Sequence, residues 1–462
     1  GTDVDNNKPT KNFTIADIIA LVPGGSSSVQ SLNSLVGALD IVAGNPQISV
    51  ATNGSNQIII STVATGGNYL EDVFVTNGVA QLGVILTVPE GAVSLTESFA
   101  TLAKIIEVSF PSTLTSITNN AFSSNLLTEI DLNQVNTVGT RAFLTNSYLQ
   151  SLNLSSVQTI GDYAFASTGF LGSGYDLVFP STLISLGDYV FSNSKINSVT
   201  FDASNQITIL PIGVFNNTQG FTSINLPSNL ITIGDGAFYG SDLTSIIVPN
   251  SVTSIGGAAF EFTNLTSAVI NNGTIGDRAF QNLSTLTSLT INSGVTSIGD
   301  RAFLSSGITT VTIPSTVTSM GTASFNGSLS LTSAIINSTV IGVTAFTNST
   351  LLSTVTLSNN LLSIGSSAFG GTGLTSITIP NTVTSLGASS FQDTSLSSIV
   401  FDSVSPITDI PQSCFKDSWE NTRIVTTLTL PEAVQTFGQE SFRQAGIQTL
   451  TVPSVVNVLG VI

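Results

Sequence analysis

Five aspartates recur in one setting along the chain, and carboxylates at regular spacing are candidates for acid-base or cation-binding chemistry. Each follows a glycine that itself follows Ile or Leu, and they are Asp162, Asp188, Asp235, Asp277 and Asp300. A catalytic pair needs two carboxylates in one place, whereas these lie a full repeat or more apart in the sequence. Because Asp favours turns and accepts backbone hydrogen bonds there, we expect these side chains to shape turns rather than to catalyse a reaction.

Three other groups have weaker chemical signatures. Glu129 and Asp131 alternate on one predicted strand face, where they either bind a cation or form an exposed pair in solvent. The stretch Asp3–Asn7 has the start of a calcium loop but lacks the glycine at the sixth loop position and the closing glutamate, so a linker is predicted. Cys414 directly precedes a phenylalanine, where a small core residue is expected.

The composition argues against most catalytic classes. The chain of 462 residues has no histidine, one cysteine and 8% charged residues. It therefore lacks the commonest general base and the commonest metal ligand. We predict no enzyme activity, no catalytic residue, no metal site and no cofactor. The net charge of −17 with only 10 scattered basic residues excludes a nucleic-acid partner. No apolar run long enough to span a membrane occurs, so any anchor is expected outside this sequence.

Beyond these single residues, the chain has an internal repeat whose anchor is a phenylalanine, usually after alanine. Intervals between anchors run from 20 to 27 residues. The anchors are Phe122, Phe143, Phe165, Phe191, Phe215, Phe238, Phe260, Phe280, Phe303, Phe325, Phe346, Phe369, Phe391, Phe415 and Phe442. A period in this range with one short strand per unit is typical of a leucine-rich repeat.

The sequence between the anchors is equally regular. Alternating β-branched runs such as LTSITIP, which starts at Leu374, indicate short strands that a proline or asparagine ends. A second apolar pair follows, as in VTSLG from Val383, and then the phenylalanine. Stacked units would form a parallel sheet over a continuous column of phenylalanine rings, because no unit can bury its own apolar residues alone.

The unit from Leu374 to Phe391 (LTSITIPNTVTSLGASSF) resembles the BspA-type leucine-rich repeat of bacterial and protist surface proteins, and the resemblance covers about residues 95–453. It implies a leucine-rich-repeat solenoid with a parallel β-sheet on the concave face and short turns or 3-10 segments on the convex face. It also implies an extracellular or cell-surface location and an adhesion role. The chain departs from the family in one respect. Asn, Ser, Thr or Gly stand a few residues after the Ala-Phe, where the family often has cysteine.

Three parts are predicted. Residues 1–12 form a flexible linker, residues 13–88 a small α+β domain or cap, and residues 89–462 an array of about fifteen repeats that is a fragment or continues further. Within the second part, Thr14–Pro23 and Ser27–Gly44 have helical spacing. PQISVA and NQIIISTV are typical of strands, and Val73–Val88 of a hairpin.

The remaining candidate for function is the outward mid-strand column, which we predict to be a partner-binding concave face. It consists of Asn225, Ile247, Val269, Thr290, Thr312, Ile335, Thr356, Thr378 and Val400. The leading hypothesis is a non-enzymatic recognition or adhesion protein that binds a protein or glycan of a host or neighbouring cell. The alternatives are β-propensity alone on this face, and a structural stalk or surface lattice whose binding function lies in the N-terminal domain or in a missing C-terminal part. A threonine ladder that binds ice is weakened by the interspersed Asn and Ile.

Overall fold

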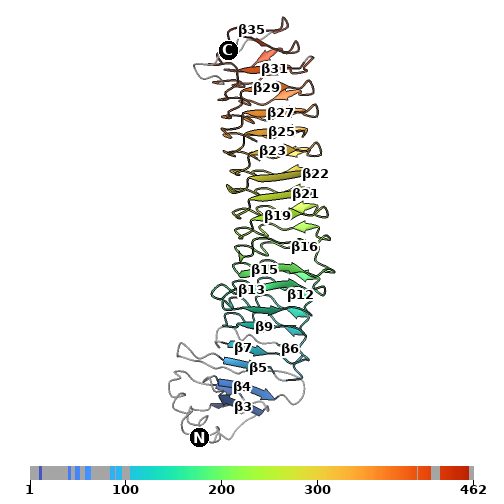
Figure 1. Cartoon of the computed structure of the whole chain (residues 1–462), viewed down its shortest axis with the longest axis vertical. Helices are drawn as coiled ribbons and strands as arrows, with labels where there is room; N and C mark the ends of the chain where they lie inside the picture. Colours follow the sequence, from blue (N-terminus) through green and yellow to red (C-terminus); the bar gives the residue numbers. More distant parts are fainter. Residues whose placement is uncertain are drawn as a thin grey trace. The chain divides into compact units, whose positions relative to one another are not determined.

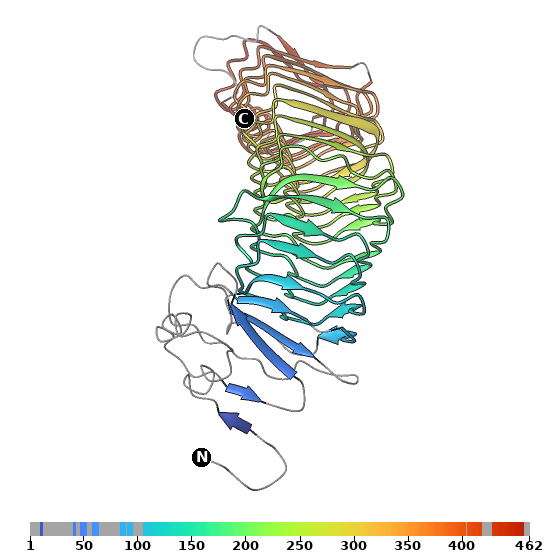
Figure 2. The ribbon, with the colours of Figure 1, turned by 60° about the horizontal axis from the view of Figure 1, so that its bottom comes forward.

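The chain is built from two compact units of stacked repeats in a computed structural model, which describes residues 10–12, 40–42, 47–52, 58–63, 84–88, 90–95, 105–402, 404–417 and 427–456. Unit 1 comprises Gly1–Ile207 and Val214–Phe221, and unit 2 comprises Thr208–Gly213 and Thr222–Ile462. Figure 1 shows the strands of each unit as successive rungs, and Figure 2 shows the coils that connect them.

Each repeat contributes a longer strand, and these strands pair in parallel in runs of two or three neighbouring repeats. In unit 1 this ladder contains β9 (Glu129–Asp131), β11 (Ser151–Asn153), β13 (Tyr175–Phe179), β15 (Lys195–Phe201) and β17 (Gln219–Gly220). In unit 2 it contains β19 (Ser245–Val248), β21 (Ser267–Ile275), β22 (Ser288–Ile298), β23 (Thr310–Ile313), β25 (Ser333–Ile336), β27 (Thr354–Leu357), β29 (Ser376–Ile379), β31 (Ser398–Phe401), β33 (Leu428–Thr429) and β35 (Leu450–Thr451). The predicted parallel solenoid is confirmed.

One strand per repeat was expected from the sequence, but the second apolar pair forms a strand too. In unit 1 these short strands are β6 (Ser94–Leu95), β8 (Ser116–Ile117), β10 (Thr137–Val138), β12 (Thr159–Ile160) and β14 (Ser185–Leu186). In unit 2 they are β16 (Ile209–Leu210), β18 (Thr232–Ile233), β20 (Ser254–Ile255), β24 (Ser319–Met320), β26 (Val340–Ile341), β28 (Ser363–Ile364), β30 (Ser385–Leu386), β32 (Asp409–Ile410) and β34 (Thr436–Phe437), while β21 and β22 span both positions. Each repeat is therefore closed on two sides by backbone pairing.

The phenylalanine column fills the space between the two ladders. The fifteen anchor rings are 0 to 7% exposed. In unit 2, consecutive rings from Phe238 to Phe442 stack with centroids 4.9 to 5.5 Å apart and interplanar angles of 2 to 15°. The predicted aromatic core is confirmed. A parallel offset stack of this kind adds to the free energy that burial of each ring contributes.

The segment around each anchor is a run of turns, which is one of the two forms predicted; the other, a 3-10 segment, does not occur among the described residues. The residues two before and two after the anchor both have positive φ, as at Arg301 (φ 56°) and Ser305 (φ 56°) around Phe303. Left-handed residues interrupt the run of i→i+3 bonds that a 3-10 helix needs. The freed N–H groups of Arg301, Phe303 and Ser305 instead donate to carbonyls of the next repeat at 2.7 to 2.9 Å. The turns are therefore a third hydrogen-bonded contact between repeats.

The described part of residues 1–88 contains strands and no helix. PQISVA and NQIIISTV contain strands as predicted, namely β3 (Gln47–Thr52) and β4 (Ile58–Val63), and the structure pairs the two antiparallel. β4 also pairs in parallel with β5 (Val84–Thr87), and β5 pairs in parallel with β7 (Ile105–Ser109).

The predicted helices of this region find no support. The helix predicted for Ser27–Gly44 is wrong at its end, because β2 (Asp40–Val42), which contains β-branched Ile41 and Val42, pairs with β1 (Thr10–Asn12). The helix predicted for Thr14–Pro23 and the Asn77-Gly78 turn lie outside the described residues, so the α+β assignment is unsupported.

Truncating one ring of the column should be costly. We expect Phe369→Ala, at a fully buried position, to lower the free energy of unfolding of unit 2 by about 3–5 kcal/mol. Phe262→Ala is the matched control, because Phe262 is 51% exposed and should cost far less. Urea denaturation measures both. Equal losses for the two variants would contradict a buried column.

Replacing a β-branched residue at a left-handed position should stabilise the fold. Thr344 has a φ of 52°, so Thr344→Gly should raise the free energy of unfolding by about 1 kcal/mol through relief of backbone strain. The same change at Thr354 in β27 should lower it, because glycine weakens a strand. Thermal denaturation of the two variants should give shifts of opposite sign.

Candidate functional site

Eight of the nine predicted partner-binding residues lie on the longer strands of unit 2. Cross-strand partners join Ile247 to Val269 and Val269 to Thr290. The same pairing joins Thr312 to Ile335, Ile335 to Thr356 and Thr378 to Val400. Asn225 is exposed but lies outside any strand. The structure thus places the other eight residues at equivalent positions of their strands, in three directly paired groups.

Alternation along each strand separates this column from the core. In β23, Val311 and Ile313 are buried while Thr310 and Thr312 are exposed. Ile247 is 64% exposed, Val400 49% and Ile335 43%. These β-branched side chains face water, although their strand neighbours fill the core.

A second outward column, absent from the predicted site, runs beside the first, two residues earlier on each strand. It contains Ser245, Ser267, Ser288, Thr310, Ser333, Thr354, Ser376 and Ser398. We call the two columns together, from Ser245 to Val400, the strand face of unit 2. The alternating pattern that located the first column also contains the second, since outward positions recur every two residues.

The equivalent positions of unit 1 are chemically different. Glu129 and Asp131 are exposed on β9, and Asp131 lies beside Asn153 of β11. Asn153 Nδ2 donates to Asp131 Oδ1 at 2.8 Å, and the backbone N–H of Asn133 donates to the same oxygen at 3.2 Å. Nowhere among the described residues do three or more His, Cys, Asp or Glu side chains converge as a metal site would require. The calcium-like stretch Asp3–Asn7 lies outside them.

The recurring aspartates accept hydrogen bonds from the backbone of the following repeat. Asp162 Oδ1 accepts from Asp188 N at 2.9 Å, and Asp277 Oδ1 accepts from Asp300 N at 2.8 Å. Asp300 Oδ1 in turn accepts from Thr322 N at 2.7 Å. The prediction that these carboxylates serve the turns is confirmed at these positions.

Buried polar side chains follow the anchors of unit 2. Three residues after the anchor, Thr263 Oγ1 donates to the Phe260 carbonyl at 2.8 Å, and Thr372 Oγ1 donates to the Phe369 carbonyl at the same distance. These threonines are 3 to 5% exposed. Each of these carbonyls also accepts the backbone N–H of the same threonine at 3.3 Å, so the hydroxyl adds a second hydrogen bond to the turn. The sequence indicates only small polar residues here; their hydrogen bonds follow from the fold.

Cys414 is fully buried, in agreement with the prediction of a small core residue. Burial raises the pKa of its thiol to about 12, and a contact of 3.2 Å with the Ser390 hydroxyl opposes that rise only in part. A thiol in this state is a poor nucleophile, because the thiolate is the reactive form.

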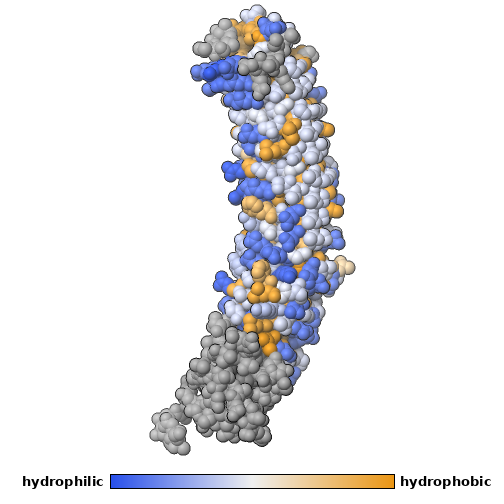
Figure 3. Space-filling model, turned by 60° about the vertical axis from the view of Figure 1, so that its left-hand side comes forward, coloured by the Kyte–Doolittle hydropathy of each residue, from blue (hydrophilic) through white to orange (hydrophobic). Residues whose placement is uncertain are grey.

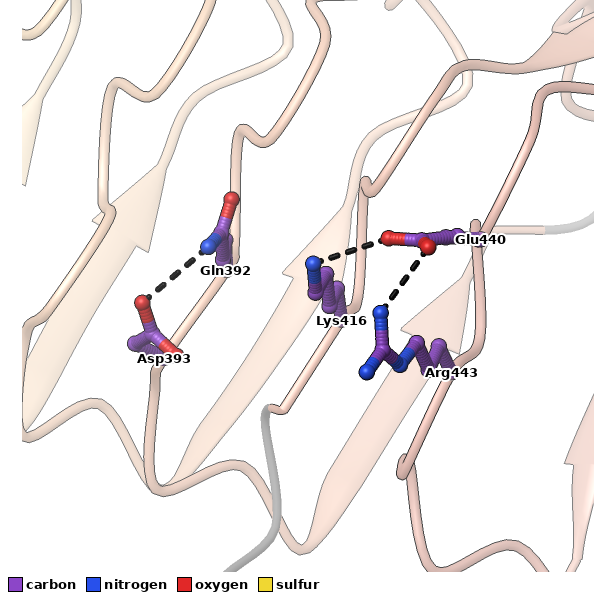
Figure 4. Close-up of polar contacts among 5 residues, drawn as sticks. All are labelled: Gln392, Asp393, Lys416, Glu440 and Arg443. Atoms are coloured by element: carbon purple, nitrogen blue, oxygen red, sulfur yellow. Dashed lines mark hydrogen bonds and ion pairs between the residues drawn. The ribbon is translucent and has the colours of Figure 1, made fainter.

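The charged cluster near the end of unit 2 is a pair of surface ion pairs (Figure 4). Lys416 Nζ lies 2.8 Å from Glu440 Oε2, and Arg443 Nη1 lies 2.9 Å from Glu440 Oε1. Hydrogen bonds from Lys416 and then Arg443 lower the pKa of Glu440. Exposed pairs of this kind contribute little to stability, and nothing in their geometry indicates a substrate site.

Glu261 is a buried acid of unit 2, at 6% exposure. Desolvation raises the pKa of its carboxyl group, while Arg278 and a hydrogen bond from Asn282 Nδ2 lower it by less. The folded state therefore holds the proton more tightly than the unfolded state does. The stabilising contribution is complete below the unfolded pKa and is lost as the pH rises through the folded pKa.

Glu261→Gln should consequently stabilise unit 2 at neutral pH, because glutamine keeps an acceptor for Asn282 and removes the buried charge. The gain should shrink as the pH falls below the ordinary glutamate range. Urea denaturation at pH 7 and at acidic pH measures this. A gain that grew on acidification would contradict desolvation as the cause of the raised pKa.

Within the described ranges we find no helical segment that would bridge a lipid bilayer. No curated protein sequence matches the chain.

Three solved structures are similar to it in fold. A leucine-rich repeat protein from Bacteroides ovatus ATCC 8483 is 18% identical, with 88% of this chain and 92% of that chain covered and a TM-score of 0.43. A leucine rich cell surface protein from Faecalibacterium prausnitzii A2-165 is 20% identical, with 69% and 94% covered and a TM-score of 0.34. The pneumococcal vaccine antigen PcpA is 15% identical, with 92% and 100% covered and a TM-score of 0.36.

The family model described as a BspA type leucine rich repeat region (6 copies) matches residues 86–173, 173–266, 253–351 and 339–461. These matches span both units and more than half of the chain, and they coincide with the stacked repeats described above. The chain belongs to the BspA-type leucine-rich repeat family.

Proposed function

We propose that the chain is a non-enzymatic recognition or adhesion protein, located at the cell surface or secreted, that binds a protein or glycan through the strand face of unit 2. The observation that carries this proposal is the aligned, exposed and uncharged character of that face. Its outward side chains come from eight strands, and all of them are Ser, Thr, Ile or Val. Repeat stacks form extended surfaces of this type, and such surfaces are used for binding.

Exposed β-branched side chains in register give the strand face its binding potential. Burying a methyl-bearing side chain such as Ile247 or Ile335 against a partner removes apolar area from water, at about 25 cal/mol per Å². Serine and threonine hydroxyls beside them can each donate and accept a hydrogen bond. Such a face favours partners with a neutral docking surface.

The chemistry of the other polar groups supports a role without catalysis. The chain has no histidine, its recurring aspartates bind the backbone at 2.8 to 2.9 Å, and its thiol is buried. A surface location is supported by the family and by the low charge content, with 8% charged residues.

Charge placed on the strand face should weaken partner binding. In a screen of immobilised glycans and host-cell surface proteins, the variant Thr312→Lys/Ile335→Lys/Thr356→Lys should bind at least about tenfold more weakly than the wild type, because lysines would be desolvated without partners. The matched control is Val178→Lys/Thr200→Lys at equivalent positions of unit 1, which should bind normally. Undiminished binding by the triple variant would refute the role of this face, provided that circular dichroism shows an intact fold.

A further inference from the structure

An inserted loop of unit 1, residues 169–174 (GFLGSG), lengthens the repeat between Phe165 and Phe191. The loop places Phe170 and Leu171 at the surface, where their side chains are 52% and 61% exposed. Burial of two such side chains would have stabilised the fold. Their exposure in an insertion that the repeat does not need therefore indicates a role other than packing.

Contacts on both sides hold this loop in place. On one side the backbone N–H of Leu171 donates to the Ser147 carbonyl at 2.8 Å. On the other side Lys195 Nζ donates to the Gly172 carbonyl at 3.1 Å. A loop that is already held loses little conformational entropy when a ligand binds to it. The insertion is thus suited to display its two apolar side chains to a ligand.

Two neutral amide side chains lie beside the loop. Gln150 Cγ lies 3.5 Å from the position that a Cβ atom at Gly172 would take, and Asn197 Oδ1 lies 2.7 Å from the corresponding position at Gly174. Both amide side chains are exposed, and neither has a hydrogen-bond partner within the part of the chain that the structure describes. Each therefore keeps donors and an acceptor for a ligand.

The second of these amides belongs to a β-bulge. In the pairing of β13 with β15, Tyr175 lies opposite Ile196 and Asp176 lies opposite Ser198. Asn197 is thus an additional residue of β15, without an opposite number on β13. Bulges re-aim side chains and are over-represented next to active sites. The insertion in one repeat and the bulge in the next meet at the same place on the surface.

Tyr148 adds an aromatic ring to this surface. Its carbonyl oxygen lies 3.3 Å from the Cβ position at Gly172, and its side chain is 41% exposed. In Figure 3 hydrophobic atoms (orange) gather on the described surface above the grey atoms, with hydrophilic atoms (blue) close to them. We define the loop site as Tyr148, Gln150, Phe170, Leu171 and Asn197.

The composition of the loop site determines which ligand it suits. A sugar ring has a face of C–H groups, which packs on an aromatic ring, and an edge of hydroxyl groups, which exchange hydrogen bonds with amides. A protein partner needs more surface: three partly exposed side chains offer on the order of 300 Å², whereas a specific protein interface buries about 800 Å² on each side. A bilayer is disfavoured, because insertion would strip water from both amides without replacing its hydrogen bonds.

We propose that the loop site binds a sugar ring of a neutral glycan, with a C–H face of the ring against Phe170 and ring hydroxyl groups at the amides of Gln150 and Asn197. The site lies in unit 1 and does not involve the strand face of unit 2, so it goes beyond the proposed function. A single ring on an exposed site binds weakly, with a dissociation constant of about 1 mM.

An array of immobilised neutral oligosaccharides that differ in their terminal sugar tests the proposal. The full chain is clustered on fluorescent beads, so that many weak contacts act together. We expect the beads to be retained by at least one terminal sugar. Phe170→Ala and Asn197→Ala should each weaken the binding of that sugar at least about tenfold in an NMR titration, whereas Phe170→Trp should keep it. Phe262→Ala is the matched control, because Phe262 of unit 2 is 51% exposed, and it should bind like the wild type.

Three results would overturn the sugar site, provided that circular dichroism shows each variant folded. They are retention by no neutral sugar, retention that Phe170→Ala and Asn197→Ala leave unchanged, and binding to phosphatidylcholine vesicles in place of sugars. Thr312→Lys/Ile335→Lys/Thr356→Lys separates this site from the proposed function, because it should keep the sugar that Phe170→Ala loses. The opposite pattern would assign that sugar to the strand face and refute the loop site alone.

Discussion

Ring-on-ring stacking of one phenylalanine per repeat is the constraint on which the structure depends. Consecutive rings lie about 5 Å apart, as from Phe303 to Phe325 at 5.0 Å, which matches the spacing of neighbouring strands in a sheet. The aromatic column and the two parallel ladders therefore share one repeat distance. A repeat can vary in length only where neither the ring nor the paired strands are displaced.

The longest insertion among the repeats of unit 1 shows how this constraint is met. Between Phe165 and Phe191 the additional residues form a loop that returns through Gly169 (φ 70°) and Gly174 (φ 77°). A Cβ atom at Gly169 would lie 2.8 Å from the Lys195 carbonyl oxygen, so the close approach requires glycine. The loop ends at Tyr175, a fully buried residue whose hydroxyl lies 2.8 Å from Thr168 Oγ1. The ring spacing to Phe191 remains 5.7 Å.

The backbone strain that this tight geometry requires is concentrated in the anchor turns. Left-handed residues occur on both sides of each anchor, and side chains as large as Tyr163 (φ 56°) and Arg278 (φ 59°) adopt this conformation. Buried hydroxyls such as that of Thr372 and carboxylates such as that of Asp300 satisfy nearby backbone groups. Polar side chains thus hold the turns in place, whereas the outward positions of the strand face carry no charged residue.

The period, the buried rings, the longer strands and the outward column containing Thr312 could all be read from the residues, because alternation and a repeat near 23 residues leave one way to bury the apolar groups. The second ladder, the left-handed pairs around each anchor and the hydrogen bonds from Thr263 to Phe260 could not. They depend on which backbone groups of one repeat meet those of the next, and that is fixed only when the repeats stack. The end of the helix expected for Ser27–Gly44 is wrong for the same reason, since the pairing of Ile41 with Lys11 outweighs a local helical pattern.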